Sequence, residues 1–212
     1  MKLEVLKYPD SRLRKKALPV QEVTAKHREL ATNMLETMYE ENGIGLAAPQ
    51  VGESIQFLVI DTRPTDENGN PTTEGLTELE KAVPQPLMIF NPQILEASEK
   101  TQYEEGCLSV PGFFETVDRS LYIEAKGLDI NGKEIQIKTD GLLAICLQHE
   151  MDHLDGKLFI DRLSFVKSNK IKNKIKKSGY PTADEVAEER EKAREARAAR
   201  KREAQSRELE KK

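Results

Sequence analysis

The chain has 212 residues and a formal net charge of −4, from 33 lysines and arginines against 37 aspartates and glutamates. This length suits one domain with a proper hydrophobic core plus extra segments. No apolar run is long enough to cross a membrane, and residues 1–10 hold no apolar signal core, so we expect a cytoplasmic protein. Cys107 and Cys146 are then expected as thiols or metal ligands rather than as a disulfide.

The charge is unevenly spread along the chain. Lys167–Lys212 holds 16 basic and 9 acidic residues, so the remainder is strongly acidic. A basic end on an acidic body suggests contact with something anionic, such as RNA. A solvent-exposed helix with many intrahelical ion pairs explains the same composition equally well.

The N-terminal region predicts one short strand and one helix. Residues 3–6 are apolar and favour an edge strand. Thr24 is placed to cap a helix that runs to about Asn42, because its apolar residues follow helical spacing. His27 lies in a charged stretch of this helix and is expected to be solvated. The small residues of 43–52 keep the next segment thin, which lets its backbone approach another chain closely.

The middle of the chain predicts strands separated by a long loop. Residues 55–62 form an apolar run typical of a buried strand. Residues 63–86 are rich in Pro, Thr, Asn and Gly and predict an extended surface loop, with at most a short helical turn at 76–81. Residues 87–90 predict another strand, which we expect to end at Asn91-Pro92.

Two hairpin-like units are expected next. Residues 93–98 and 101–103 are candidate strands of the first. Residues 121–126 and 134–138 flank Asn131-Gly132, and Asn-Gly tolerates the positive φ of a tight turn, so they predict a second hairpin.

A helix following this hairpin carries the pattern H-E-x-x-H. Asp140 is a plausible N-cap and Gly156 a stop signal. Residues four apart share one face of a helix, so His149 and His153 can direct their imidazoles to one metal ion, with Glu150 beside them to exchange a proton with water. The alternative is that two helical histidines are ordinary core or surface residues.

A hydrolytic metal centre requires a third protein ligand and an open position for water. Cys107 is the preferred candidate, because the intervening hairpin can return it to the helix. Cys146, three residues before His149, is the rival, although three ligands on one helix face would be crowded. Cys146 is therefore interpreted as a small wall residue.

The C-terminal region predicts charged helices. Residues 164–177 have a few apolar side chains among many lysines, and residues 179–182 break the pattern. From Ala183 onward the composition favours helix but leaves almost no apolar stripe to bury. We expect a solvent-exposed, partly disordered helix there.

Three stretches resemble the motifs of the peptide deformylase family, in that family's order and approximate spacing: GIGLAAPQ (43–50), EGCLS (105–109) and QHEMDHL (148–154). The resemblance covers roughly residues 5–162. It implies an α+β fold of small antiparallel β-sheets packed around a central helix carrying H-E-x-x-H, with an N-terminal helix and a C-terminal helical tail.

The resemblance also implies an activity, removal of the N-formyl group from the N-terminal formyl-methionine of newly synthesised polypeptides. It implies Fe²⁺ as the metal, for which Zn²⁺, Ni²⁺ or Co²⁺ can substitute. The implied metal ligands are Cys107, His149 and His153. The implied catalytic groups are Glu150 as general acid and base, and the side-chain amide of Gln50 and backbone N–H of Leu108 as donors to the oxyanion.

The methionine side chain needs a flexible apolar slot, and the peptide backbone needs an edge to pair with. The residues expected to supply them, by resemblance and helix spacing, are Gly43, Ile44, Gly45, Leu142, Ile145 and Cys146. The alternative for the apolar ones is that they are simply core.

Two segments depart from the family pattern, namely the long loop at 63–86 and the charged tail. The loop either covers part of the cleft rim or is inert. We expect a catalytic domain at 1–163 and a helical extension at 164–212 that contacts ribosomal RNA. A monomer without membrane attachment is expected.

Two rival functions remain at this point. A zinc metalloprotease also uses H-E-x-x-H, although it usually completes the site with His or Glu rather than Cys. A structural metal site in a ribosome-associated module would instead have four protein ligands and no open position.

Overall fold

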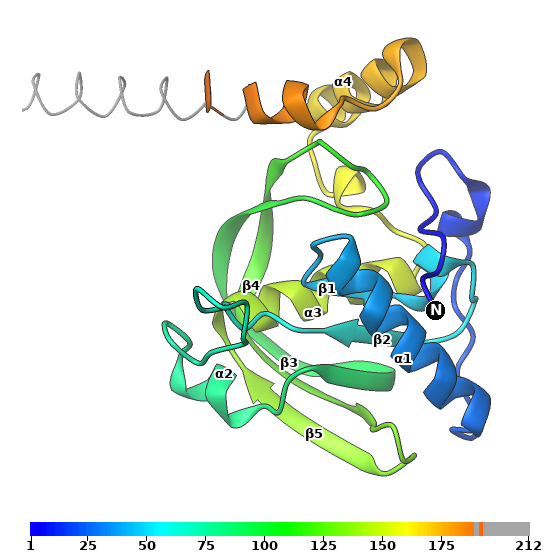
Figure 1. The fold of residues 1–212 in the computed structure, drawn as a ribbon, viewed down its shortest axis with the longest axis vertical. Coiled ribbons are helices and arrows are strands. Elements are labelled where there is room, and N and C mark those ends of the chain that lie inside the picture. Colours follow the sequence, from blue (N-terminus) through cyan, green and yellow to red (C-terminus); the bar gives the residue numbers. More distant parts are fainter. Residues whose placement is uncertain (189–190, 193–212) are drawn as a thin grey trace, which may run out of the picture.

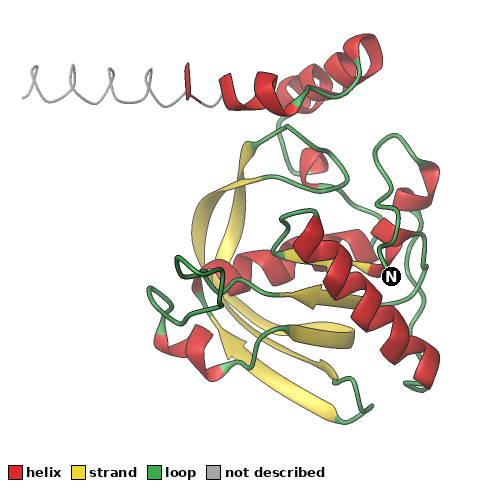
Figure 2. Ribbon diagram, viewed as in Figure 1, coloured by secondary structure: helices red, strands yellow, loops and turns green. Residues whose placement is uncertain are grey.

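One antiparallel sheet runs through the protein, with its strands in the order β1-β2-β3-β4-β5 (Figures 1 and 2). The computed structural model describes residues 1–188 and 191–192. The strands are β1 (Gly45–Ala47), β2 (Phe57–Ile60), β3 (Leu87–Glu105), β4 (Glu115–Leu128) and β5 (Glu134–Thr139). We expected several small sheets. They join into one because β3 and β4 pair along nearly their whole length.

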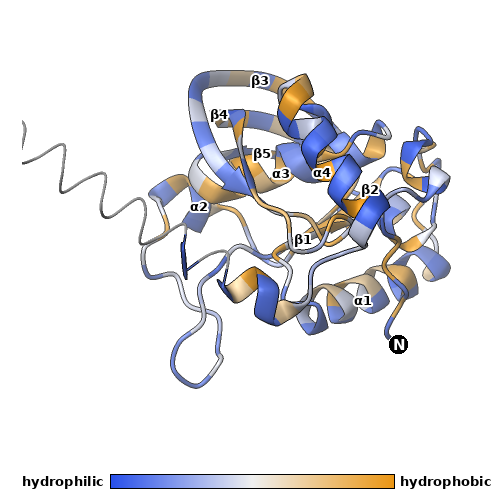
Figure 3. Cartoon of the chain, turned by 90° about the horizontal axis from the view of Figure 1, so that it is seen from above, coloured by the Kyte–Doolittle hydropathy of each residue, from blue (hydrophilic) through white to orange (hydrophobic). Residues whose placement is uncertain are grey.

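Helices flank this sheet. They are α1 (Ala25–Glu40), α2 (Glu78–Ala82), α3 (Gly141–Leu154) and α4 (Phe165–Ser178), with short 3-10 turns η1 (Ser11–Arg14), η2 (Ala48–Val51) and η3 (Phe159–Asp161). Figure 3 shows α3 as mostly hydrophobic and α4 as mostly hydrophilic. No helix within the described residues is both long enough and apolar enough to span a membrane.

Strand β2 lies between two helices, which explains its uninterrupted apolar sequence. Leu58 and Ile60 belong to the hydrophobic cluster that includes α3, whereas Phe57 and Val59 belong to the cluster that includes α1. Successive side chains of a strand point to opposite faces, so covering both faces buries all four residues. The strand is shorter than the predicted 55–62.

The predicted helix at the N-terminus is confirmed, but His27 has a role that we did not expect. The Thr24 backbone N–H donates to Nδ1 of His27 at 3.0 Å, which closes the first turn of α1. The His27 ring also lies edge-on to Phe90, 5.7 Å away. The histidine is thus a helix cap rather than a merely solvated side chain.

Residues 3–6 form no strand, contrary to the prediction. The Leu3 N–H donates to Oγ1 of Thr37 on α1, and the Leu6 N–H donates to the carbonyl of Gln50. Their hydrogen bonds therefore go to a helix side chain and to a 3-10 turn, and not to a neighbouring strand.

The predicted strand end at Asn91-Pro92 and the separate strands at 93–98 and 101–103 are also wrong. All of them belong to β3. Its register against β4 shifts between Phe90 and Gln93, and Asn91 has a φ of +49°. A proline without an N–H and a residue with positive φ are tolerated in a strand at a bulge, so the chain passes through without ending. The hairpin of β4 and β5 is confirmed.

Helix α4 packs onto the body of the protein. Ile171 and Ile175 lie in a cluster with Phe113 and Leu158, among others. The far ends of β3 and β4 curve toward α4 (Figure 1). Most of the charged helix expected after Ala183 lies outside the described residues.

Candidate metal centre and active site

One sulfur and two imidazoles meet beside α3. Ligand atoms of Cys107, His149 and His153 all lie within 4.8 Å of one another, and Cys107 Sγ is 3.3 Å from His153 Nε2. The histidines lie one turn apart on α3, and Cys107 follows the end of β3. Cys146 is not in this group, because its thiol points to the carbonyl of Ile44 at 3.6 Å.

The donor set fits a divalent transition metal. A thiolate with two imidazoles suits zinc or iron, and three protein ligands leave room for water and substrate. Oε2 of Glu150 is buried beside them and has no hydrogen-bond partner among the described residues. An unsatisfied buried oxygen is costly unless something polar occupies the space before it, which supports a hydrated ion at this position.

A buried chain of charges orients His149. Its Nδ1 lies 2.8 Å from Oε2 of Glu105, which leaves Nε2 for a metal. Arg119 contacts the same carboxylate through two hydrogen bonds of 2.6 and 2.8 Å, and it also donates to Asp152 at 2.7 Å. Arg162 contacts Asp152 from the surface side. Burial pushes the pKa of Glu105 up, but the hydrogen bonds from Arg119 and His149 outweigh burial and lower that pKa.

Gln50 is held so that its amide nitrogen points toward Cys107. Its Oε1 accepts from the Ala47 backbone N–H at 2.8 Å. Its Nε2 donates to Oγ of Ser109 at 3.1 Å and approaches Sγ of Cys107 at 3.6 Å. Because the oxygen is fixed by backbone, the amide presents N–H donors at the metal group and not an acceptor.

Glu150 is almost fully enclosed. Its residue is 4% exposed, and burial raises its pKa to about 7. A carboxyl group in this range can both accept and return a proton near neutral pH. Gly45 makes the enclosure possible, since a Cβ at that position would lie 2.9 Å from Cδ of Glu150 and 2.7 Å from Sγ of Cys146.

A cavity of about 400 Å³ opens onto these groups. Every residue predicted for the slot and the peptide edge lines it, namely Gly43, Ile44, Gly45, Leu142, Ile145 and Cys146. Gln50, Cys107, Leu108, His149 and Glu150 line it as well. The cavity therefore joins the apolar slot to the candidate metal group.

Sequence reasoning missed two sets of residues around the metal group and the cavity. The first is the chain of Glu105, Arg119 and Asp152, of which Glu105 and Asp152 at least lie within the recognised motifs. The second is a pair of aromatic residues that also line the cavity, Tyr103 and Phe114. Nothing in the sequence pattern marked these two aromatic residues.

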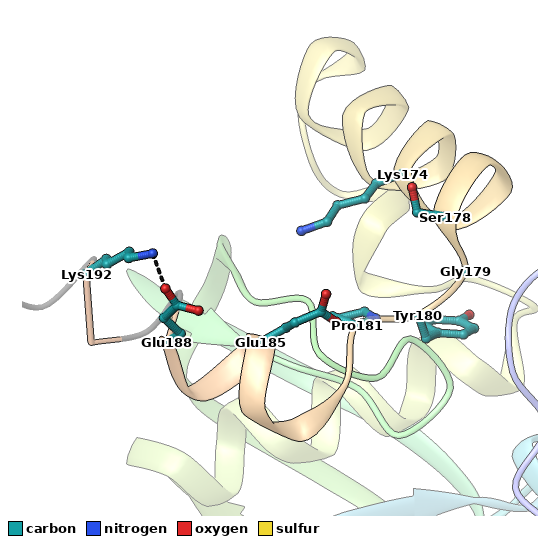
Figure 4. Close-up of a pocket in the computed structure, with 8 residues that line it drawn as sticks. All are labelled: Lys174, Ser178, Gly179, Tyr180, Pro181, Glu185, Glu188 and Lys192. Carbon is teal, nitrogen blue, oxygen red and sulfur yellow. Dashed lines mark hydrogen bonds and ion pairs between the residues drawn. The ribbon is translucent and has the colours of Figure 1, made fainter.

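A smaller hollow of about 230 Å³ lies between α4 and the residues that follow it (Figure 4). Lys174, Glu185, Glu188 and Lys192 line it, and Lys192 pairs with Glu188. This hollow shares no residue with the metal group.

A mixed helix and antiparallel sheet fold, with a Cys-His-His group beside a buried glutamate, places the protein among the metal-dependent hydrolases. The family model for polypeptide deformylase matches residues 2–169, and the chain belongs to this family. The family removes the N-formyl group from nascent peptides. The metalloprotease and the non-catalytic module are not supported.

Known relatives agree with this assignment. A peptide deformylase from Acinetobacter baumannii (strain SDF) is 44% identical over 82% of this chain and 90% of that protein. The crystal structure of peptide deformylase from Ehrlichia chaffeensis is 41% identical, with a TM-score of 0.73 over 86% of this chain and 99% of that one. A Met-Ala-Ser-bound structure of class I type b peptide deformylase from Acinetobacter baumannii is 32% identical, with a TM-score of 0.67 over 77% of this chain and 99% of that one.

Proposed function

We propose that the chain removes the formyl group in the cavity described above, with Fe²⁺ held by Cys107, His149 and His153. The convergence of these three side chains from two separate elements carries the proposal. A divalent ion held there supplies a Lewis acid that activates water and draws charge from the formyl oxygen. Zn²⁺, Ni²⁺ or Co²⁺ can take the same place, since the ligand set suits each of them.

Gln50 and the backbone N–H of Leu108 stabilise the negative charge that develops on the formyl oxygen. The amide of Gln50 is already oriented by the Ala47 backbone N–H, which directs the amide nitrogen toward the metal group. One such donor is typically worth about 3 kcal/mol in the barrier. Because the Gln50 amide is neutral, it can stabilise this charge without repelling the uncharged N-terminus of the formylated substrate.

Glu150 moves the protons. It takes one from the attacking water and later gives one to the nitrogen of the leaving amine, which becomes the free N-terminus. Its pKa of about 7 allows both steps near neutral pH.

The methionine side chain enters the slot formed by Ile44, Leu142, Ile145 and Cys146. The peptide backbone lies along residues 43–45, which lead into β1, an edge strand that pairs only with β2 among the described strands. The relative with bound Met-Ala-Ser supports peptide binding of this kind. Backbone pairing ignores side-chain identity, which suits an enzyme that accepts many nascent chains.

Formate release from formyl-Met-Ala-Ser by anaerobically purified, Fe²⁺-loaded protein tests this function. We expect fast turnover, lost in Cys107→Ser and declining in air as the iron or thiolate oxidises. An unformylated peptide of the same sequence serves as the control for internal cleavage. Turnover that survives Cys107→Ser would refute the proposed metal group.

We further propose a monomer that acts in the cytoplasm, with a catalytic domain at 1–163 and an extension at 164–212 that contacts ribosomal RNA. Lys170, Lys176 and Lys177 are exposed on α4 and support an anionic partner. Co-sedimentation with ribosomes at matched salt tests this. Two variants are compared with the full chain. The first ends at Ser178 and keeps the buried Ile171 and Ile175. The second reverses the charge of all three lysines. Undiminished binding in both variants would reject the contact.

A further inference from the structure

The loop at 63–86 reaches the start of the helix that carries both histidines. Its helix α2 packs beside β5, which ends at Thr139, and α3 begins at Gly141. Glu80 of α2 is 4% exposed although it is a glutamate. A carboxylate this deeply buried requires hydrogen-bond donors, and the identity of these donors indicates what the side chain stabilises.

One oxygen of Glu80 caps α3. The Leu143 backbone N–H donates to Oε1 of Glu80 at 3.1 Å. Leu143 is the third residue of α3, and its N–H is the one that an N-cap side chain normally satisfies. Asp140, the N-cap residue predicted from the sequence, makes no such bond. Its carboxylate accepts from the hydroxyl of Thr77 instead.

The other oxygen of Glu80 closes its own helix. Oε2 accepts from the Thr77 backbone N–H at 2.9 Å, and the Glu80 N–H donates to Oγ1 of Thr77 at 3.0 Å. Because this capping box fixes the carboxylate, Oε1 is held in place for α3. Gly141 allows the approach, since a Cβ there would lie 2.8 Å from Oε1.

A negative charge at this end of α3 is also favourable electrostatically, because the N-terminus of a helix carries partial positive charge. The first turns of α3 supply Leu142, Ile145 and Cys146 to the cavity wall. A cap on Leu143 therefore fixes the position of the slot wall, about two turns before the histidines.

We propose that Glu80 is a positioning residue for substrate binding: the loop at 63–86 supplies, from a distant region of the chain, the cap that sets the methionine slot. This inference rests on the assignment of the cavity as the formyl-methionine site. The loop is then a working component of the enzyme and not an inert insertion.

Glu80→Ala and Glu80→Gln test the proposal on the Fe²⁺-loaded full chain. The matched control is Glu78→Gln, which removes a charge from the exposed side of the same short helix. We expect Glu80→Ala to raise KM for formyl-Met-Ala-Ser about five-fold, with little change in kcat, on the assumption that the stability lost with a helix cap appears in full in substrate binding. Glu80→Gln keeps one acceptor oxygen and should lie between Ala and wild type.

Two further readouts separate positioning from general stability. Formyl-Ala-Ala-Ser has no long side chain for the slot, so the preference for formyl-Met over it should fall in Glu80→Ala. Hydrogen exchange at the Leu143 amide should accelerate in Glu80→Ala and stay unchanged in Glu78→Gln. If Glu80→Ala fails to fold, Glu80→Gln carries the same comparison.

An unchanged KM, preference and Leu143 exchange in both Glu80 variants would overturn the proposal, as would equal effects in Glu78→Gln. Absence of turnover in the wild type would instead refute the proposed function. The exchange measurement does not depend on activity, so it still decides whether Glu80 caps α3.

Discussion

In the proposed mechanism, both proton transfers depend on Glu150. Glu150→Gln keeps the volume but can neither accept nor return a proton, so we expect kcat to fall by a factor of about 10² to 10⁴. Metal content should stay at the wild-type level, because Glu150 is not among the three proposed ligands. Formate release and elemental analysis of the same samples check both statements. Loss of metal in parallel with activity would show that the glutamate holds the ion.

For single residues, the sequence predicts the candidate metal and catalytic side chains better than the residues that orient them. Helical periodicity alone places His149 and His153 on one face, and the EGCLS motif singles out Cys107 over Cys146. The hydrogen bond between His149 and Glu105 is different, because it joins β3 to α3 through tertiary packing that no local spacing encodes. Glu80 was missed for the same reason, since Asp140 satisfied every local rule for a cap.

Three elements are joined by Arg119, which lies on β4 and contacts Glu105 of β3 and Asp152 of α3. Its side chain is only 1% exposed. Arg119→Leu removes the buried cation that two buried carboxylates share, so we expect a loss of about 3–5 kcal/mol in the free energy of unfolding.

Arg162→Leu is the matched control for this prediction. Arg162 contacts the same Asp152, but its side chain is 40% exposed, so its removal should cost about 1 kcal/mol or less. Urea unfolding of the three proteins measures the difference. If both variants lost the same free energy of unfolding, burial would not determine how much each arginine contributes to stability.

The elements themselves were predictable where local signals agree. The helix capped at Thr24, the Asn-Gly hairpin and α3 each combine periodicity with a start or stop signal, and all three are present. Strand β3 was divided wrongly because Asn91-Pro92 is a strong local breaker. Pairing with β4 on either side keeps the strand continuous, and this long-range effect is not visible in a short window.

The stability of the whole molecule should depend on pH through Asp61. Burial pushes its pKa up, but hydrogen bonds from Arg63 and Tyr39 outweigh burial, and the pKa is lowered. The stabilisation is then present above the ordinary pKa of aspartate, about 4, and is lost as the pH falls through the lower folded-state value. We expect the free energy of unfolding to fall in this acid range and Asp61→Asn to flatten the fall. Denaturant unfolding from neutral to acid pH measures it. An unchanged slope in the variant would contradict the assignment.

The cavity reaches inward as far as Glu150 and His149, both of which are buried. In the proposed mechanism, a peptide therefore reaches the reacting groups only by inserting its first residue, with the next few laid out along residues 43–45. A protein whose leading residues have already docked into its own structure presents nothing that fits. We therefore expect deformylation to compete with folding of the substrate protein, so that proteins whose N-termini fold first keep their formyl groups.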